Sequence, residues 1–457
     1  MFRFADGAMI LAVATLGCRS QSLSTAHETF NTESYNLDNH VDGSSSSMHT
    51  FRHAAPWLEL NNVFVRGHRA TATETHDVVF QVKQKNMDVL TKILHEISDP
   101  NHLNYGNHMT MEEINDISSN PDSHDEIIHY MKEAGATHLF DANGGQSIGF
   151  RGSVALWERV FNTEFYSVES VANANSNSHV IDPKKFIRSE KYSLPKSLHA
   201  HVAHVSNTID VPTEFLLPHR ISTVKTPKYT RTKELGTGTI IRPYLTPERL
   251  NQIYDIDDNT GHPRATQAAY EGYGQLYSPE DLKKFQVEMG VPIIPLNYSD
   301  PTYEATVAQC SARRDYCAEA NLDYQYMTSV SWSPTLHHYR LEKRFTEWVT
   351  TMTQTARVPY VITISYGSEE QYFDSGELGL FDEGAIKLGL RGVTIIVASG
   401  DDGVAPRTAR WDSSKCQYMP SFPSSSAYVT SVGGTQVCFY TLYYFNQNAN
   451  YLRQFLC

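Results

Sequence analysis

Two continuous apolar runs in the C-terminal half of the chain constrain its fold more than any other feature. Residues 358–365 and 393–398 each have the composition of a buried strand, and a helix is expected between them, from about residue 378 to residue 390. A third apolar run, at residues 291–296, is expected to add another strand. Continuous apolar strands separated by helices are typical of a parallel sheet with helices on both faces. The sequence therefore predicts an α/β fold for this half.

The preceding segment, residues 55–205, has a different pattern. Apolar residues alternate at 78–82 and recur at helical spacing at 87–97, which indicates a strand followed by a helix. Further strands are expected at 138–141, 147–150 and 164–168, and further helices at 127–135 and 154–161. This order of short elements predicts a small α+β sandwich of the ferredoxin-like kind. Nothing in the segment suggests catalysis.

The remaining segments differ from these two domains in composition. We expect a signal peptide at residues 1–20, a disordered lead-in at 21–54, a linker at 206–242, a main domain at 243–435 and an aberrant aromatic tail at 436–457. The signal peptide is indicated by one basic residue and an apolar stretch too short to cross a bilayer. The linker holds a basic segment from Lys225 to Lys233 between prolines, which indicates a processing site open to proteolysis.

The charge of the chain bears on its partners and location. The formal net charge is −13 at pH 7. Nucleic acids and anionic membranes are bound by basic surfaces, so we expect neither as a partner. The signal peptide and a glycosylation sequon at Asn297-Tyr-Ser299 predict a protein that is secreted or lysosomal/vacuolar.

The cysteines indicate a disulfide rather than a metal site. Cys310 and Cys317 are close enough in sequence to bridge a local loop. No Cys-x-x-Cys or His-Glu-x-x-His pattern occurs, so the sequence does not predict a zinc site.

A pair of acidic residues follows that loop. Glu319 and Asp323 lie four residues apart in a segment expected to be helical, so both carboxylates lie on one face of the helix. Like charges at this spacing destabilise an isolated helix by roughly 0.2–0.5 kcal/mol, so the pair is either solvated or kept for a function. Ligands of parallel sheets bind beyond the carboxyl ends of the strands, and two acidic, glycine-containing loops follow the strands there, at 365–370 and 399–403. Taken separately, each of these loops is also compatible with an ordinary turn.

Several motifs occur in a fixed order along the chain. They are Asp99-Pro-Asn-His-Leu-Asn-Tyr-Gly106, Asn162-Thr-Glu-Phe-Tyr166, Glu319-x-x-x-Asp323, Ile364-Ser-Tyr-Gly367, Ala398-Ser-Gly-Asp401 and Phe422-Pro-Ser-Ser-Ser-Ala-Tyr-Val-Thr-Ser-Val-Gly-Gly-Thr435. In this order they resemble the sedolisin family of serine-carboxyl peptidases, over residues 55–435. The resemblance implies a subtilisin-like sheet in the main domain, and it implies that the front domain is an activation propeptide acting as an intramolecular inhibitor and chaperone.

The resemblance also implies roles for three acidic residues. Glu319 would be the general base for a serine nucleophile, Asp323 would orient Glu319, and Asp401 would donate a hydrogen bond to the oxyanion. A close carboxylate pair shares a proton and titrates as a unit, which suits acid pH, where a histidine base would be protonated. The implied function is that of a secreted acid zymogen that cleaves peptides, most closely with tripeptidyl-peptidase activity.

The family's nucleophile motif, Ser-Gly-Thr-Ser, does not occur in the 457 residues. The serines after Asp401 are Ser413, Ser414, Ser421, Ser424, Ser425, Ser426 and Ser431, and none lies in that context. The family's calcium site would also lie beyond the end of this sequence, so no metal ligand is predicted within it. We therefore expect this chain to be inactive as it stands, and a truncated gene model is the expected reason.

Two other functions stay open at this stage. The chain could be a non-catalytic remnant or peptide-binding pseudopeptidase. It could also be a secreted glycosidase that uses the two carboxylates across a sugar cleft, although that reading does not explain the front domain.

Overall fold

The computed structural model describes residues 48–434 apart from 52–54, 56, 58–63, 143, 171–184, 212–244, 257–260, 263, 273–274, 298–302, 333–334, 341–343 and 411. The predicted signal peptide, most of the predicted linker and the predicted tail lie outside these residues. Within the described ranges, no helix combines the length and apolar character needed to cross a bilayer.

The front domain comprises strands and helices up to residue 206. Its elements are β1 (Met48–Phe51), β2 (Phe64–Arg69), β3 (Thr75–Val82), α1 (Met87–Ser98), α2 (Met111–Ser118), α3 (Pro121–Ala134), β4 (Thr137–Ala142), β5 (Ser147–Ser153), α4 (Val154–Phe161), β6 (Phe165–Ser170), β7 (Lys185–Ser189), β8 (Tyr192–Pro195) and β9 (Val202–Ser206). An antiparallel sheet of order β4-β5-β3-β9 forms its centre, with a smaller sheet of order β2-β6-β7 beside it. The predicted α+β domain is confirmed.

The two ends of this domain lie differently from their predicted limits. Met48–Phe51, inside the segment expected to be a disordered lead-in, forms β1 and pairs with β8. Ile209 and Val211, beyond residue 205, are buried in the core. The position at which the chain is processed stays a prediction.

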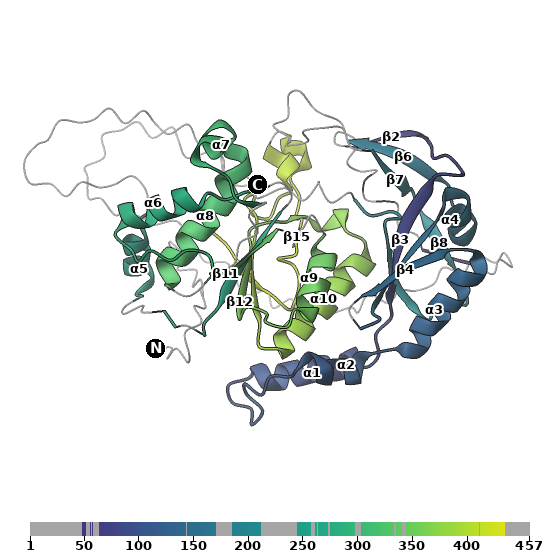
Figure 1. The fold of residues 1–457 in the computed structure, drawn as a ribbon, viewed down its shortest axis with the longest axis horizontal. Helices are drawn as coiled ribbons and strands as arrows, with labels where there is room; N and C mark the ends of the chain where they lie inside the picture. The colour runs from purple at the N-terminus through teal and green to yellow at the C-terminus, as the bar shows by residue number, and fades with distance from the viewer. Residues whose placement is uncertain are drawn as a thin grey trace, which may run out of the picture.

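The second domain contains the parallel sheet. Its elements are α5 (Pro247–Tyr254), β10 (Gln267–Glu271), α6 (Pro279–Met289), α7 (Val307–Ala312), α8 (Arg314–Ser331), β11 (Thr335–Arg340), α9 (Phe345–Gln354), β12 (Val361–Ile364), β13 (Ser368–Glu369), α10 (Ser375–Leu390), β14 (Thr394–Ala398), β15 (Ser421–Phe422) and β16 (Thr430–Val432). The strand order is β11-β10-β12-β14-β16, and all neighbouring pairs are parallel. Helices α6 and α8 lie on one side of the sheet and α9 and α10 on the other (Figure 1). The predicted α/β fold is confirmed.

The strand predicted at residues 291–296 is wrong. This segment is an irregular loop after α6, and Ile293 is 56% exposed. Its two prolines, Pro292 and Pro295, have no N–H to donate to a neighbouring strand. The side chain of Gln286 instead accepts from the Ile294 N–H at 3.2 Å and donates to the Ile294 carbonyl oxygen at 2.9 Å, replacing a strand partner.

The expected disulfide is present. Cys310 in α7 and Cys317 in α8 are bonded to each other, with 5.4 Å between their Cα atoms. The bond joins the short helix to the N-terminal part of α8, directly before the acidic pair.

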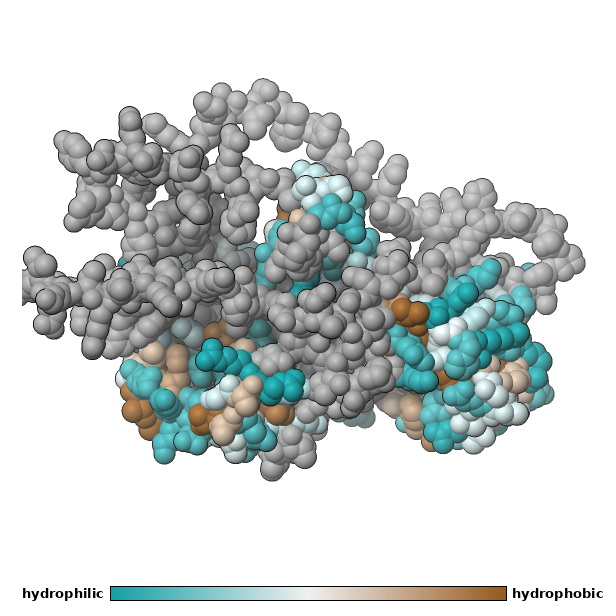
Figure 2. Space-filling view, turned by 90° about the horizontal axis from the view of Figure 1, so that it is seen from above, coloured by the Kyte–Doolittle hydropathy of each residue, from teal (hydrophilic) through white to brown (hydrophobic). Residues whose placement is uncertain are grey.

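The two domains share one hydrophobic core. Helices α9 and α10 lie between the parallel sheet and the sheet of the front domain (Figure 1), and buried residues of both domains form a single cluster. A second cluster joins α1 and α2 to the C-terminal end of α10 through Leu90, Ile97, Ile114, Ile386 and Leu390. On the described part of the face in Figure 2, hydrophobic residues are interspersed with hydrophilic ones.

Candidate active site

Helix α8 holds Glu319 and Asp323 against the parallel sheet. Ala320 and Tyr324, which neighbour the two acidic residues in sequence, are fully buried between α8 and β10. Glu319 is only 7% exposed. The alternative that the Glu319 carboxylate is solvated on the helix surface is therefore excluded by the structure.

Ser365 joins the pair from the neighbouring strand. It directly follows β12, so its side chain lies at the carboxyl edge of the sheet, where the sequence predicted the site. Its hydroxyl lies 2.9 Å from Oδ2 and 3.1 Å from Oδ1 of Asp323 and donates a hydrogen bond to this carboxylate. The sequence analysis included Ser365 in a motif but gave it no role, and the structure shows that it fixes the position of the Asp323 carboxylate.

A third carboxyl group lies behind the pair. Glu271, the last residue of β10, is fully buried, and the hydroxyl of Tyr366 donates to its Oε2 at 2.9 Å. Its Oε1 is buried without a hydrogen-bond partner. Sequence reasoning missed this residue because Gln267–Glu271 lacks the apolar character of a central strand, although all five residues are buried.

Burial and mutual repulsion raise the pKa values in this cluster. Burial raises the pKa of Glu319, and the charges of Asp323 and Asp401 raise it further. Burial also raises the pKa of Asp323, while the hydrogen bond from Ser365 lowers it. The pKa of Glu271 is well above its ordinary value because the group is buried and faces Asp323. The three groups are therefore not all ionised at neutral pH, and the titration of each depends on the charge of the others.

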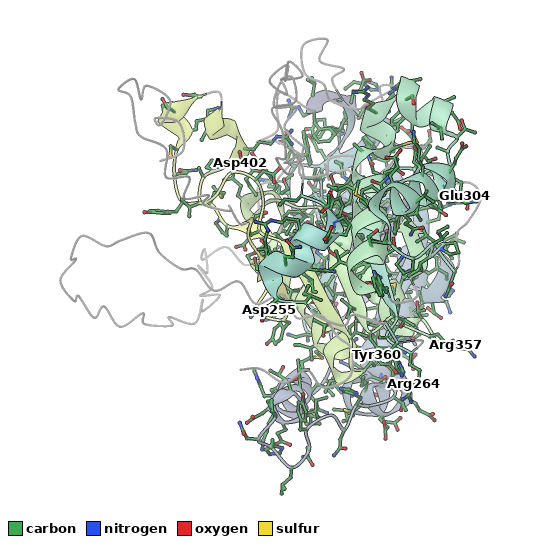
Figure 3. The ribbon with its side chains drawn as sticks, turned by 90° about the vertical axis from the view of Figure 1, so that its left-hand side faces the viewer. Asp255, Arg264, Glu304, Arg357, Tyr360 and Asp402 are labelled. Atoms are coloured by element: carbon green, nitrogen blue, oxygen red, sulfur yellow. A yellow bond between two sulfur atoms is a disulfide. The ribbon has the colours of Figure 1, made fainter. Side chains whose placement is uncertain are left out.

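Asp401 lies in the turn that follows β14. Gly400, with φ of 94°, allows the chain to turn sharply there. Asp401 is exposed, and its charge raises the pKa of Glu319. Figure 3 shows the adjacent Asp402 far from Tyr360, which precedes β12, so the turn lies at the carboxyl end of the sheet. The structure thus brings Glu319, Asp323 and Asp401 to one edge.

Three of the serines that follow Asp401 have hydrogen-bond partners of their own. The Ser426 hydroxyl donates to Asp382 Oδ1 at 2.5 Å, and that of Ser424 donates to the Ser421 carbonyl at 2.7 Å. The Ser414 hydroxyl donates to Asp412 at 2.6 Å. These three hydroxyls are thus engaged away from Glu319.

No metal site was found in the part of the chain that the structure describes. There, no group of three or more His, Cys, Asp or Glu residues is arranged to hold a metal ion. The calcium expected from the resemblance has no ligands that can be named here and stays a prediction.

Comparison with known proteins shows which family and which relatives this chain is similar to. Residues 62–211 match the family described as the pro-kumamolisin activation domain. Tripeptidyl-peptidase 1 of Canis lupus familiaris is 27% identical over 382 residues, and that of Homo sapiens is also 27% identical over 382 residues. Each match covers 80% of this chain and 62% of the relative, so the chain spans less than two thirds of the length of these relatives.

Two solved structures show a weaker likeness. One is a Pseudomonas sedolisin, described as a serine-carboxyl proteinase complexed with two molecules of pseudo-iodotyrostatin, at 22% identity and TM-score 0.32, covering 41% of this chain and 53% of that one. The other is the epidermin leader peptide processing serine protease of Staphylococcus aureus, at 12% identity and TM-score 0.32, covering 79% and 70%. At these scores the two structures carry no argument of their own.

The activation-domain match and the similarity to tripeptidyl-peptidase 1 agree with the motifs that were read from the sequence. These matches support the resemblance to the sedolisin family: residues 62–211 are similar to the pro-kumamolisin activation domain, and 80% of the chain is similar to tripeptidyl-peptidase 1.

Proposed function

We propose that this chain is the zymogen of a secreted or lysosomal acid peptidase of the sedolisin type, with tripeptidyl-peptidase activity. The observation that carries the proposal is the pair of buried Glu319 and half-buried Asp323 at the carboxyl edge of the parallel sheet. Ser365 donates a hydrogen bond to Asp323, and Glu271 lies behind the pair. A solvated acidic pair would need neither the burial nor these partners.

In the proposed mechanism, Glu319 accepts the proton of a serine hydroxyl as that oxygen attacks the peptide carbonyl carbon. Asp323, held by Ser365, orients Glu319 and shares its proton, so the charge moves within the pair. Glu319 then returns the proton to the leaving amine. Asp401, protonated in acid, donates a hydrogen bond to the oxyanion that develops on the carbonyl oxygen.

The role of the activation domain follows from its contact with the second domain. We propose that it inhibits the peptidase within the chain and that it assists folding. Its match to an activation domain supports the inhibitory part of this role.

The experiment must supply the nucleophile, because no Ser-Gly-Thr-Ser segment occurs in the 457 residues. The transcript and genomic DNA downstream of codon 435 should be read for such a segment in any frame or exon. A chain carrying it should hydrolyse an N-terminally free tripeptide amide with an optimum in acid, and Glu319→Gln should abolish that hydrolysis. Equal activity at pH 8, or activity insensitive to Glu319→Gln, would contradict the mechanism.

A second candidate is a pseudopeptidase that binds peptides without cutting them. It would use the same Glu319–Asp323 pair, held by Ser365, without a serine nucleophile. A locus without a Ser-Gly-Thr-Ser segment, together with measurable peptide binding by the chain, would support this candidate over the peptidase.

A further inference from the structure

A cluster of six charged residues crosses the boundary between the two domains, away from the acidic site. The activation domain contributes Arg188, His204 and Asp210, and the second domain contributes Arg344, Asp374 and Glu377. All six are at least 93% buried, with exposed fractions of 6%, 3% and 1% for the first three and 6%, 7% and 1% for the others. Neither the acid chemistry nor the parallel sheet requires ions at this position.

Two ion pairs of the cluster cross the boundary. His204 Nδ1 lies 3.3 Å from Asp374 Oδ1, and Arg344 Nη1 lies 3.7 Å from Asp210 Oδ2. On the activation-domain side, Arg188 Nη2 lies 3.3 Å from the same oxygen of Asp210. On the other side, Arg344 is paired with Glu377.

The charges on the two sides are complementary. With all groups ionised, the activation domain carries two positive and one negative charge, and the second domain carries one positive and two negative charges. The docked cluster is therefore neutral, whereas each half alone is not. A buried ion network of this kind adds little affinity over an apolar contact, but it selects the partner and register because any unpaired member is costly to bury.

The N-terminus of α10 is shaped for this contact. Oδ1 of Asp374 caps the helix by accepting from the N–H groups of Gly376 and Glu377, at 2.8 and 3.2 Å, and the same oxygen lies 3.3 Å from His204 Nδ1. A Cβ atom at Gly376 would lie 2.8 Å from His204 Nδ1. Only glycine leaves room for the imidazole to approach the cap.

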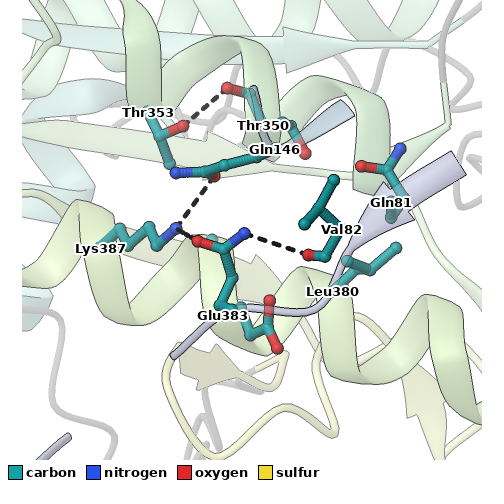
Figure 4. A pocket seen from close by; sticks show the side chains of 10 residues that line it. Gln81, Val82, Gln146, Thr350, Thr353, Leu380, Glu383 and Lys387 are labelled. Atoms are coloured by element: carbon teal, nitrogen blue, oxygen red, sulfur yellow. Dashed lines mark hydrogen bonds between the residues drawn. The ribbon is translucent and has the colours of Figure 1, made fainter. Parts of the chain in front are cut away.

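A second polar contact lies on the same boundary, farther along α10. Lys387 Nζ donates to Gln84 Oε1 at 3.1 Å and to Gln146 Oε1 at 3.0 Å, in a small pocket between the two domains (Figure 4). The activation domain therefore meets α10 through directional polar contacts at two positions.

We propose that the six-residue cluster is an ionic lock that keeps the activation domain bound to the second domain after the linker is cut, and that acidification to about pH 5 does not open it. This inference does not depend on the proposed peptidase activity, because it concerns only the association of the two domains.

His204 stabilises the docked state in acid and loses this effect in alkaline solution. Burial alone would lower the pKa of His204, but the charge and hydrogen bond of Asp374 raise it from 6.5 to about 9. The stabilisation from His204 is therefore complete below pH 6.5 and is lost as the pH rises through about 9.

Of the three acidic members, Asp210 and Asp374 keep their charge in mild acid, whereas Glu377 takes up a proton. Burial raises the pKa of Glu377 from 4.5 to about 7, so its cost to the docked state fades as the pH falls through that range. Burial raises the pKa of Asp210 and Asp374, but nearby cationic groups outweigh this effect and lower both below 3.8. Their stabilisation is lost only when the pH falls below that value.

Two further groups face the cluster from neighbouring strands. His76 of β3 has a pKa lowered to about 4 by burial, so it stays neutral from neutral pH down to that value. Burial and the nearby carboxylates raise the pKa of Tyr192 on β8, which keeps its hydroxyl neutral. Neither group opposes the lock in mild acid.

The test uses the whole chain with a specific protease sequence placed between residues 225 and 233. The folded chain is cut there, and size-exclusion chromatography follows the two pieces at constant ionic strength. We expect the wild-type pieces to co-elute at pH 7 and at pH 5. Separation of the wild-type pieces at pH 5 but not at pH 7 would overturn the proposal, and this result requires no variant.

Two variants test the residues themselves. Asp374→Asn keeps a helix-capping side chain but removes the charge opposite His204, and we expect it to weaken association of the cut pieces about a hundredfold. Gly376→Ala should weaken association through the clash with His204. The control, Arg151→Gln, breaks an exposed ion pair with Asp77 inside the activation domain and should leave association unchanged. If the cut pieces of Asp374→Asn and those of Gly376→Ala both associate as tightly as the wild-type pieces, the proposal is overturned.

Discussion

Three carboxyl groups, those of Glu271, Glu319 and Asp323, share one buried region at the ends of β10 and β12. The pKa of each group is raised, and burial is the largest cause in all three cases. The sequence predicted the i,i+4 pair because both members lie on one helix. It could not predict Glu271, because only the pairing of β10 with β12 brings this residue beside α8.

The raised pKa values predict an effect of pH on stability. A carboxyl group whose pKa is raised by folding stabilises the fold below its unfolded pKa and loses that contribution as the pH rises through its folded pKa. Glu271→Gln should therefore stabilise the chain at pH 8 and change its stability little at pH 4. Denaturant unfolding of both chains at the two pH values measures this. Equal effects at both pH values would show that Glu271 is not held protonated.

The hydroxyl of Ser365 gives a second prediction at this scale. Its hydrogen bond lowers the pKa of Asp323, so Ser365→Ala should raise that pKa further, by roughly one unit for a hydrogen bond worth about 1.4 kcal/mol. Carboxyl-stretch infrared difference spectra of Ser365→Ala, with Asp323→Asn to assign the band, measure the shift. Ser368→Ala, which removes a hydroxyl bonded to Glu369, is the matched control. An unmoved Asp323 band in Ser365→Ala would contradict the assignment.

At the scale of elements, the sequence predicted those whose ends carry local signals. Ser153 caps α4 by accepting from the Leu156 N–H, and Gly135 ends α3 with φ of 95°. The elements it missed or misplaced depend on distant contacts. Gln267–Glu271 is a central strand despite its polar composition, because strands on both sides supply its hydrogen bonds. The apolar run at 291–296 is a loop because Pro292 and Pro295 have no N–H to donate to a neighbouring strand.

The pair of helices α1 and α2 gives a prediction at the same scale. Leu90 is fully buried among Ile97, Ile114 and the end of α10, where it joins the activation domain to the second domain. Leu90→Ala should lower the free energy of unfolding by about 2–5 kcal/mol through the lost contacts and the cavity. Its neighbour Val89 is 43% exposed, so Val89→Ala should change stability by less than about 0.5 kcal/mol. Urea unfolding followed by circular dichroism compares the two, and equal midpoints would contradict the packing role of Leu90.

At the scale of the whole molecule, the Glu319–Asp323 carboxyl pair is assembled, but the nucleophile motif does not occur in the 457 residues. We expect this chain, cut in its linker and brought to acid pH, to hydrolyse peptides no faster than its Glu319→Gln variant. A fluorogenic tripeptide amide assay, read against that variant to remove background protease, measures the difference. Turnover that disappears in Glu319→Gln would contradict the prediction and would require another serine as nucleophile.

The dependence of the second domain on the activation domain is the last prediction. Without the activation domain, the apolar C-terminal end of α10 would lose its contact with Leu90, and Arg344 would lose its ion pair with Asp210. A parallel sheet forms slowly because its contacts are distant in sequence, so these unpaired surfaces would be exposed for a long time during folding.

Residues 243–457 expressed alone should therefore be mostly insoluble and show no cooperative unfolding, and co-expression of residues 55–211 should restore soluble material. Restoration should fail when the co-expressed domain carries Asp210→Leu, which leaves Arg344 without its partner across the boundary. The fraction of soluble protein and the near-ultraviolet circular dichroism of that fraction are the measurements. Soluble 243–457 with a cooperative transition of its own would show that the sheet needs no template, and the activation domain would then act only after folding.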